Sequence, residues 1–336
     1  MTTEFYRQDL EVLESIGCKV TVATSLKEVP RSTDLVFVWW WTWLWLVGPV
    51  LKLRGIPVCV TGSLEPEIYE GYRWYQRLLV RWGMRFADKS VFVSRYMIER
   101  LRKLMDLDGP LYCPHVVMDE YRPLSPTNER AEPRVVFNVA WKRTENMKRK
   151  MLPELIEAFA LVKERMPEAR LVLAGEPVDG QALLERMVEE RSLEGHVEFL
   201  GKISKEQKIR YMQSCGAYYQ CSRHEGFGLA IAEAMACGAP VVVNRRTAIP
   251  EVVGDAGYYV EDETPEAIAD RLVEALADPE ASRELGCEAA DRVDRLFRFA
   301  RRRDFFADLL PKMLRPGIAR RESQAGGVGR AASSAA

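Results

Sequence analysis

The stretch SRHEGFGLAIAEAMACGAPVVV, residues 222–243, has the order of a parallel α/β unit. A glycine-rich loop leads into a helix of small residues, a stop at Gly238 and an apolar strand. Gly226 and Gly228 let the backbone bend and come close to a ligand. The free amide groups at the start of this helix attract an anion, helped by the helix dipole. The stretch therefore predicts an anion-binding turn in a parallel sheet.

Two carboxylates bracket this turn, Glu225 in the loop and Glu233 two turns into the helix. A carboxylate beside a phosphate is repelled, so we expect both to accept hydrogen bonds from neutral hydroxyl groups, which sugars supply. An anion with hydroxyl-bearing groups on both sides describes a nucleotide sugar. The alternative is that Glu225 only caps the helix and Glu233 is solvated, because a G-x-G before a helix is a weak signal by itself.

Strand and helix patterns alternate along the rest of the chain, which indicates parallel sheets covered by helices. We expect strands at residues 19–24, 35–40, 56–62, 90–94, 111–117, 134–140, 169–177, 197–203, 217–222 and 241–243. We expect helices at residues 3–16, 42–55, 95–104, 153–166, 229–237 and 306–314.

The polar, proline-containing segment 122–133 has the composition of an interdomain linker. We therefore expect a first domain over residues 1–125 and a second over 126–314, whose last helix is able to pack back on the first domain. From Arg315 the tail has too few apolar residues to bury, so residues 315–336 are expected to be disordered.

Residues 35–51 carry no charge and contain five tryptophans. A transmembrane helix needs about 20 consecutive apolar residues, and this run is shorter and is interrupted by Pro49. We favour a buried strand at 35–40 followed by a helix with Thr42 at its N-cap. A third interpretation is that part of the helix rests on a membrane surface.

The composition of the chain argues against several classes of protein. The net charge of -1 argues against a nucleic-acid binder. Seven cysteines without a C-x-x-C pair and three scattered histidines predict neither disulfides nor a metal site. The N-terminal sequence lacks a signal-peptide core, which favours a cytoplasmic protein.

The segment EGFGLAIAEAMACGAPVV, with IPEVVGDAGYYVED at 249–262, resembles the E-x7-E signature of the retaining glycosyltransferases of family 4. The resemblance implies a GT-B fold, with two Rossmann-like domains facing a cleft. It implies transfer of a hexose-type sugar from a nucleotide sugar to an unknown acceptor, either lipid-linked or a saccharide, without a cofactor or a metal. The rival hypotheses are an inactive relative that only binds the nucleotide sugar and another GT-B enzyme, such as a sugar-nucleotide epimerase.

The resemblance also assigns roles. Glu225, Arg143 and Lys150 form the catalytic set, since two cations would neutralise the charge that gathers on the leaving diphosphate. Lys142 competes with Arg143 for the arginine position. The alternative is that the basic loop with Lys142, Arg143, Lys148, Arg149 and Lys150 is only solvated. Further donor contacts are expected from Gly226, Phe227, Gly228, Leu229, Glu233, Gly175, Lys202 and His224.

The first half departs from the family. Members open with an apolar strand and a glycine-rich loop, whereas this chain starts directly in its first helix. That strand is central in a doubly wound sheet. The sequence therefore predicts either a truncated reading frame or another segment in its place. Ser63 and His115 are the residues expected on the acceptor side.

Residues 72–89, YRWYQRLLVRWGMRFADK, predict a helix with a row of arginines and apolar aromatic faces. Arg73, Arg77, Arg81 and Arg85 are spaced four residues apart. Such a helix either lies on an anionic membrane surface, at the inner face of the membrane, or packs on the sheet with an arginine edge.

Overall fold

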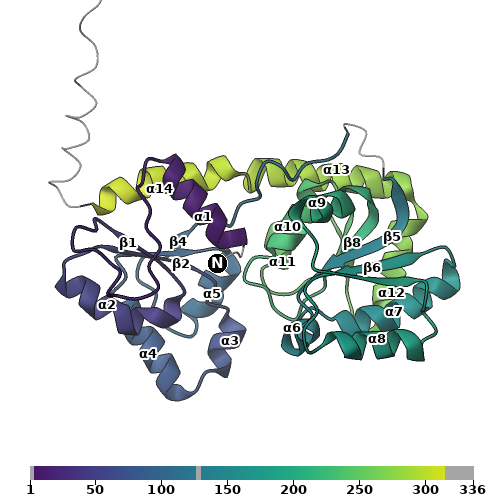
Figure 1. The fold of residues 1–336 in the computed structure, drawn as a ribbon, viewed down its shortest axis with the longest axis horizontal. Helices are drawn as coiled ribbons and strands as arrows, with labels where there is room; N and C mark the ends of the chain where they lie inside the picture. The colour runs from purple at the N-terminus through teal and green to yellow at the C-terminus, as the bar shows by residue number, and fades with distance from the viewer. Residues whose placement is uncertain (1–3, 126–129, 315–336) are drawn as a thin grey trace, which may run out of the picture. The chain divides into compact units, whose positions relative to one another are not determined.

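The computed structural model describes residues 4–125 and 130–314, which form two α/β units (Figure 1). Unit 1 contains the described residues up to Val93, Met97–Pro114 and those from Ala300 onward. Unit 2 contains Ser94–Tyr96 and His115–Phe299. Apart from Ser94–Tyr96, unit 2 begins at His115, which is earlier than the expected linker at residues 122–133. Residues 300–314 belong to unit 1 again. The prediction that residues 315–336 are disordered concerns residues that the structure does not describe.

Unit 1 is built on a four-stranded parallel sheet of order β1-β2-β3-β4. Its strands are β1 (Val36–Trp39), β2 (Val58–Gly62), β3 (Lys89–Phe92) and β4 (Leu111–Tyr112). Its helices are α1 (Glu4–Ser15), the 3-10 turn η1 (Trp41–Trp43), α2 (Leu44–Leu53), α3 (Pro66–Gly71), α4 (Trp74–Met84), most of α5 (Arg95–Arg102) and most of α14 (Phe299–Met313).

The tryptophan-rich stretch forms a strand and a helix, as predicted. Residues 36–39 pair with β2, and the amide of Trp40 donates to the carbonyl of Thr61 at 3.3 Å. Trp41 is buried and stacks on Phe92 with ring centroids 4.4 Å apart. The N-cap prediction at Thr42 is wrong, because a 3-10 turn occupies Trp41–Trp43 and α2 begins only at Leu44. Within residues 4–125 and 130–314, none of the helices combines the length and the apolar character that crossing a membrane requires.

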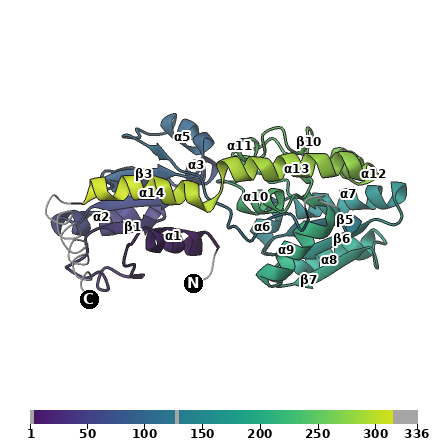
Figure 2. The same ribbon diagram turned by 90° about the horizontal axis from the view of Figure 1, so that it is seen from above.

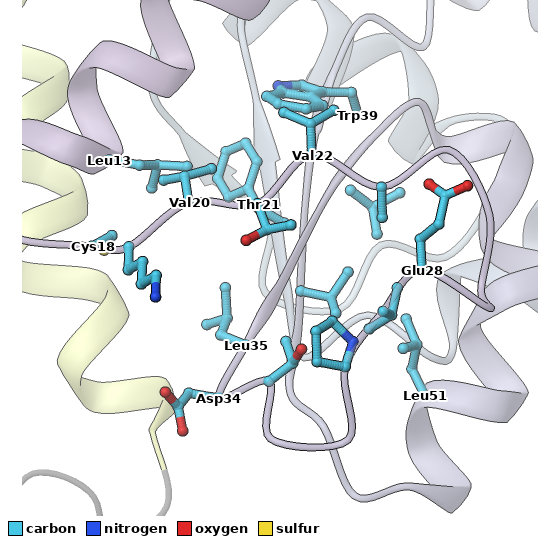
Figure 3. A pocket seen from close by; sticks show the side chains of 18 of the residues that line it. Leu13, Cys18, Val20, Thr21, Val22, Glu28, Asp34, Leu35, Trp39 and Leu51 are labelled. Carbon is cyan, nitrogen blue, oxygen red and sulfur yellow. The ribbon is translucent and has the colours of Figure 1, made fainter.

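The predicted strand at residues 19–24 is wrong. Residues 18–23 have no regular secondary structure, and β1 is an edge strand. A strand needs a neighbour for its backbone hydrogen bonds. A large cavity lies between this segment and β1, which explains why the segment forms no ladder (Figure 3).

Unit 2 contains a six-stranded parallel sheet of order β10-β9-β8-β5-β6-β7. Its strands are β5 (Glu132–Val139), β6 (Arg170–Ala174), β7 (Val197–Gly201), β8 (Cys215–Tyr219), β9 (Val241–Asn244) and β10 (Tyr258–Val260). Its helices are α6 (Thr144–Arg149), α7 (Leu152–Arg165), α8 (Gln181–Glu190), α9 (Lys205–Ser214), α10 (Leu229–Ala236), α11 (Ile249–Val253), α12 (Pro265–Ala277) and α13 (Pro279–Leu296).

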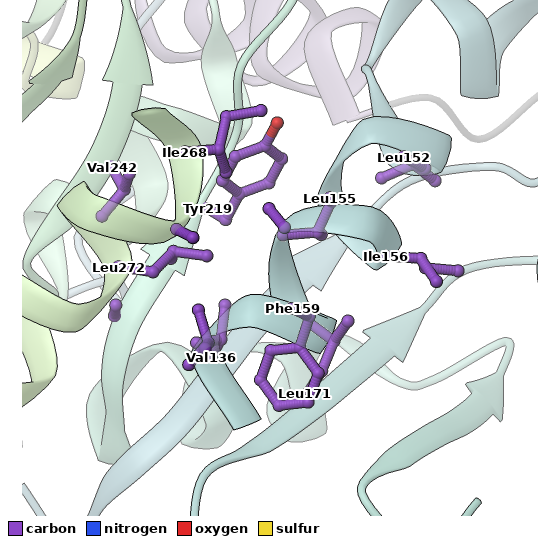
Figure 4. Close-up of a cluster of buried hydrophobic side chains, with 14 of the residues drawn as sticks. Val136, Leu152, Leu155, Ile156, Phe159, Leu171, Tyr219, Val242, Ile268 and Leu272 are labelled. Atoms are coloured by element: carbon purple, nitrogen blue, oxygen red, sulfur yellow. The ribbon is translucent and has the colours of Figure 1, made fainter. Parts of the chain in front are cut away.

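The core of unit 2 forms where α7 and α12 cover one face of this sheet. Leu155 and Phe159 lie one turn apart on α7, and both are fully buried. Figure 4 shows them gathered with Ile268 and Leu272 of α12. This packing fixes α7, and therefore also the loop that precedes it.

The two ends of the described chain meet in unit 1, where α14 lies beside α1 (Figures 1 and 2). The buried guanidinium of Arg302 contacts the carboxylate of Asp9, with Nε 2.6 Å from Oδ1. It also donates to the carbonyls of Cys113 at 2.9 Å and Pro114 at 3.0 Å. Burial alone would lower the pKa of Arg302, but the charges of Asp9 and Cys113 together with the hydrogen bonds to these residues outweigh burial, and the pKa is raised. Arg302 therefore stays charged inside unit 1.

Candidate functional site

The predicted anion-binding turn lies between β8 and α10, at the carboxyl end of the unit 2 sheet. This end is where parallel α/β sheets bind their ligands. Gly228 occupies the N-cap of α10 in the left-handed region, with φ of 97°, a conformation that glycine adopts without strain. Leu229 is the first residue of α10 and is half-buried.

Glu225 is buried in this turn, with 9% of its surface exposed. Its Oε1 accepts hydrogen bonds from the ammonium of Lys150, from Ser222 Oγ at 2.9 Å and from Gln220 Nε2 at 3.2 Å. Arg149 Nη1 also lies 3.2 Å from the same oxygen. Glu225 does not act as a helix cap, because its carboxylate is directed to this cluster and the N-cap of α10 is Gly228.

The charge state of Glu225 follows from these contacts. Burial raises the pKa of a carboxyl group, but the positive charges of Lys150 and Arg149 and the hydrogen bonds outweigh this effect. The pKa of Glu225 falls to about 2. One carboxylate thus faces two cations at neutral pH, which leaves a surplus positive charge near the start of α10.

The two cations come from the end of α6 and the residue that follows it. Arg149 ends α6, and its Nη1 also donates to the backbone carbonyl of His224 at 3.0 Å. The amide of Arg223 donates to the carbonyl of Arg149 at 2.8 Å. Lys150 follows directly and is buried, with 8% exposed. The basic segment is therefore attached to the glycine-rich turn and is not simply solvated.

The two residues proposed for the arginine position lie elsewhere in this segment. Arg143 is the N-cap residue of α6, and its side chain is exposed. Lys142 is fully buried, and its ammonium donates to the carbonyl of Gly175 at 3.0 Å. Burial lowers the pKa of Lys142 to about 8. The guanidinium that joins Lys150 at Glu225 belongs to Arg149.

Gly175 forms a tight turn after β6. Its φ is 124°, and a Cβ atom added there would overlap the carbonyl group of Ala140. Its amide donates to the carbonyl of Gly201 at 2.8 Å, which joins the ends of β6 and β7. Lys202 follows Gly201 and has an exposed side chain. The ends of three neighbouring strands, β5, β6 and β7, are thus close together at this edge.

Glu233 lies inside unit 2, with 2% of its surface exposed, so the solvated alternative is wrong. Its Oε2 is 3.0 Å from Lys208 Nζ of α9. That ammonium also lies 5.0 Å from the centre of the Tyr121 ring. The second acid of the motif is therefore a buried carboxyl group with a cation beside it.

The remaining predicted residues fall in different places. Phe227 is buried, and its ring makes an edge contact with His115, with centroids 5.7 Å apart. His115 thus packs on the glycine-rich turn within unit 2. Ser63 follows β2 in unit 1, with its Oγ 3.5 Å from a carboxylate oxygen of Glu65.

The sequence analysis missed Gln220, Ser222 and Lys208. A signal existed for the first two, because they are polar residues directly after an apolar parallel strand, at the end where ligands bind. Lys208 carried no such signal, since one lysine on a polar helix face is ordinary. Within residues 4–125 and 130–314, no three His, Cys, Asp or Glu side chains are grouped so that they could hold a metal ion.

Comparisons with known proteins bear on this site. The family model described as glycosyl transferases group 1 matches residues 129–292. The chain is 28% identical over 259 residues to N-acetyl-alpha-D-glucosaminyl L-malate synthase of Bacillus anthracis, covering 74% of this chain and 64% of the relative, less than two thirds of its length. It is 27% identical over 286 residues to the GDP-mannose-dependent alpha-(1-6)-phosphatidylinositol monomannoside mannosyltransferase of Mycolicibacterium smegmatis, covering 79% and 74%.

The fold has solved counterparts. The crystal structure of HepE from Anabaena in complex with UDP and glucose superimposes with a TM-score of 0.72 at 19% identity, over 84% of this chain and 79% of that one. The two units thus have the GT-B fold, each with a parallel sheet. Residues 129–292, which match the family model of the glycosyl transferases group 1, contain the turn, both acids and the basic segment.

Proposed function

We propose that the protein is a retaining glycosyltransferase that moves a hexose-type sugar from a nucleoside diphosphate sugar to an acceptor hydroxyl group. The observation that carries this proposal is the cluster at Glu225, where a buried carboxylate and the cations of Lys150 and Arg149 meet beside the start of α10. Such a cluster offers an acceptor for sugar hydroxyls and positive charge for a diphosphate within one site.

Each group then has a role. Lys150, with Arg149 or Arg143, neutralises the charge that develops on the leaving diphosphate. Glu225 accepts hydrogen bonds from the hydroxyls of the donor sugar, and Glu233 accepts from the ribose. The amide of Leu229 binds a phosphate oxygen at the end of the helix dipole.

The reaction itself needs few groups from the protein. The bond between the anomeric carbon and the phosphate oxygen breaks, and the acceptor oxygen bonds to the same face of that carbon. The proton of the acceptor hydroxyl passes to the departing phosphate oxygen.

We propose that no metal takes part, because the cations and the helix end supply the positive charge. Activity that persists in excess EDTA supports this, and activity restored only by a divalent cation contradicts it.

The relatives support a nucleotide sugar as donor, since one is named as GDP-mannose-dependent and the HepE structure contains UDP and glucose. A thermal-shift screen with UDP, GDP, ADP and dTDP sugars identifies the base, because a ligand that binds the folded state raises the melting temperature. Donor hydrolysis is then compared between the wild type and Glu225→Gln. Hydrolysis lost in the variant supports an enzyme, whereas binding without turnover in the wild type favours a relative that only binds the donor.

We also propose that the protein works in the cytoplasm at the inner face of the membrane, with α4 of unit 1 as the contact. Trp74, Leu78 and Trp82 are 75%, 53% and 45% exposed on this helix. Arg77 and Arg81 partly face inward, since their Nε atoms donate at 3.0 Å to the Tyr72 carbonyl and the Tyr69 hydroxyl. Aromatic rings with guanidinium groups beside them suit the interface of an anionic bilayer.

This contact is testable without an acceptor. Wild type is expected to float with anionic vesicles at low salt, and a Trp74→Ala/Trp82→Ala variant is expected to stay in the dense fraction. Leu183→Ala, which removes an exposed apolar side chain from α8 in unit 2, is the matched control. A wild type that does not float removes the membrane from the proposal and leaves the donor site untouched.

A further inference from the structure

The glycine-rich turn is also held by the loop that follows β9. Thr247 of this loop accepts a hydrogen bond from the backbone amide of Glu225, with its Oγ1 2.9 Å from the nitrogen. Asn244, at the end of β9, holds Ser222: its Oδ1 accepts from the Ser222 amide at 3.0 Å, and its Nδ2 donates to the Ser222 carbonyl at 3.1 Å. Both ends of residues 222–225 are therefore attached to one loop.

The side chain of Asn244 is itself fixed in one orientation. It is buried, with 2% of its surface exposed, and its Nδ2 also donates to Glu263 Oε1 at 2.8 Å. Exchanging its oxygen and nitrogen would place an NH₂ group against the Ser222 amide, so only one orientation satisfies these three contacts. Asn244 is thus a rigid attachment point for the turn.

The same loop reaches the carboxylate of Glu225 through Ser222. The backbone of Ser222 is held by the loop, and its Oγ donates to Glu225 Oε1 at 2.9 Å. Gln220 Nε2 donates to the same oxygen at 3.2 Å. Both of these donors are neutral groups, unlike Lys150 and Arg149, which bring positive charge to the same carboxylate.

The difference between neutral and charged contacts matters once a donor binds. In the proposed function the diphosphate engages the two cations, and Glu225 then shares them or loses them. The contacts that remain are those of Ser222 and Gln220 with the carboxylate and that of Thr247 with the amide. A shift of about 1 Å in a positioned group can cost a factor of about 100 in rate. The place of Glu225 in the donor complex therefore depends on these neutral groups.

The backbone of Thr247 lies in the left-handed region, with φ of 50°. This conformation is rare for a β-branched residue, whereas glycine adopts it without strain. Strained residues of this kind persist where the surrounding structure fixes them. A glycine here would remove the strain, but it would also remove the hydroxyl group that binds the Glu225 amide. The sequence thus keeps a hydroxyl group where the backbone favours glycine.

We propose that Thr247 is a positioning residue for Glu225. Its hydroxyl holds the backbone of Glu225 so that the carboxylate stays within reach of the donor sugar when the diphosphate engages the basic residues. Thr247 acts only through Glu225 and touches no reacting atom. The inference rests on the proposed function, in which Glu225 accepts hydrogen bonds from the sugar hydroxyls.

Thr247→Gly tests the hydroxyl, because it removes the contact and relieves the backbone strain together. Its melting temperature is expected to stay within about 4 °C of the wild type. Amide exchange at Glu225 is expected to become faster, since the amide loses its acceptor, and Thr247→Ser is expected to restore the slow exchange. Ser192→Gly is the matched control: Ser192 has φ of 52° and lies between α8 and β7, at the amino end of the sheet, away from the turn.

Affinity distinguishes positioning from a general loosening of the turn. The probes are UDP-glucose, GDP-mannose, ADP-glucose and dTDP-glucose, each compared by calorimetry with its free nucleoside diphosphate. Thr247→Gly is expected to weaken binding of the preferred nucleotide sugar by about 10-fold or more and binding of its diphosphate by less than about twofold, since Glu225 meets only the sugar. The value of kcat/KM for donor hydrolysis is expected to fall by about 10- to 100-fold. Thr247→Ser should recover most of both losses, and Ser192→Gly should show neither.

Two results would overturn this proposal while leaving the proposed function in place. One is equal weakening of the nucleotide sugar and its diphosphate in Thr247→Gly, because Thr247 would then only stabilise the turn. The other is unchanged amide exchange at Glu225 in that variant. Failure of the proposed function would instead be seen in the wild type, which would bind none of the four nucleotide sugars, and this inference would fail with it.

Discussion

The ammonium group of Lys150 donates a hydrogen bond to the buried carboxylate of Glu225, which lies 75 residues further along the chain. This contact joins the segment before α7 to the turn before α10. A donor that brings a diphosphate to Lys150 must share or replace this contact. The acid and the cations therefore act as one unit, and changes to either should affect both binding and turnover.

Replacing Lys150 tests that unit. Lys150→Met is expected to lower kcat/KM by about 100- to 1000-fold, because a positioned group that stabilises transition-state charge is lost. Lys148→Met is the matched control, since Lys148 is two residues away and exposed. Steady-state donor hydrolysis measures both. Equal, small losses in kcat/KM for the two variants would show that Lys150 takes no part in the reaction.

Stability at acid pH should depend on Glu225. Its pKa of about 2 lies below the ordinary value of 4.5, so its stabilising contribution is complete above pH 4.5 and is lost as the pH falls toward 2. Wild type should therefore exceed Glu225→Gln in unfolding free energy at pH 6, and the gap should narrow below pH 4.5 by up to about 1.4 kcal/mol per pH unit. Urea titrations from pH 6 to pH 3 measure it, and a constant gap would contradict this assignment.

Glu233 is expected to act on nucleotide affinity. Glu233→Gln should weaken binding of the preferred nucleoside diphosphate by about 10- to 100-fold, because a hydrogen bond to a charged group is worth about 1.5–3 kcal/mol. Calorimetry measures the change, with exposed Glu190→Gln as control. If the folded variant binds the nucleotide as tightly as wild type, Glu233 takes no part in nucleotide binding and its role is limited to the contact with Lys208.

The turn at Gly175 should tolerate no side chain. Gly175→Ala combines a positive φ with overlap against the Ala140 carbonyl, and a loss of more than about 3 kcal/mol in unfolding free energy is expected. Gly195→Ala is the control, because its φ is 78° and a Cβ there meets nothing within 4 Å. That variant should lose only about 1–2 kcal/mol. Similar losses would show that strain alone, and not overlap, sets the cost.

The ion pair of Arg302 with Asp9 should matter more than any surface pair. Arg302→Met leaves the buried carboxylate of Asp9 without its cation, so a loss of about 3–5 kcal/mol is expected. Arg303→Met, next to it and exposed, should change stability by less than about 0.5 kcal/mol. Denaturant unfolding of both variants provides the comparison. An unchanged Arg302→Met would mean that packing alone holds α14 on unit 1.

Sequence patterns predicted most of the regular elements because each buries a recognisable face. The apolar run before Trp41 and the helix around Phe159 are examples. The prediction was wrong at residues 19–24, where the sequence alternates like a strand but no strand within residues 4–125 and 130–314 pairs with it. Strand propensity describes a fit to a sheet and not an intrinsic backbone preference.

The site was harder to predict where contacts depend on tertiary structure. The motif located Glu225 and Glu233, and both acids proved to be buried beside cations. The sequence did not indicate that Arg149 lies 3.2 Å from Glu225, whereas the side chain of Arg143 is exposed. Spacing along the chain does not reveal which basic side chain faces the turn.

The contact of Arg302 with Asp9 has a consequence for biosynthesis. Unit 1 needs residues from before and after unit 2 in the sequence. During translation, unit 2 can therefore fold before α14 has been made. Unit 1 cannot close until α14 has left the ribosome, and until then its apolar strands are exposed to chaperones.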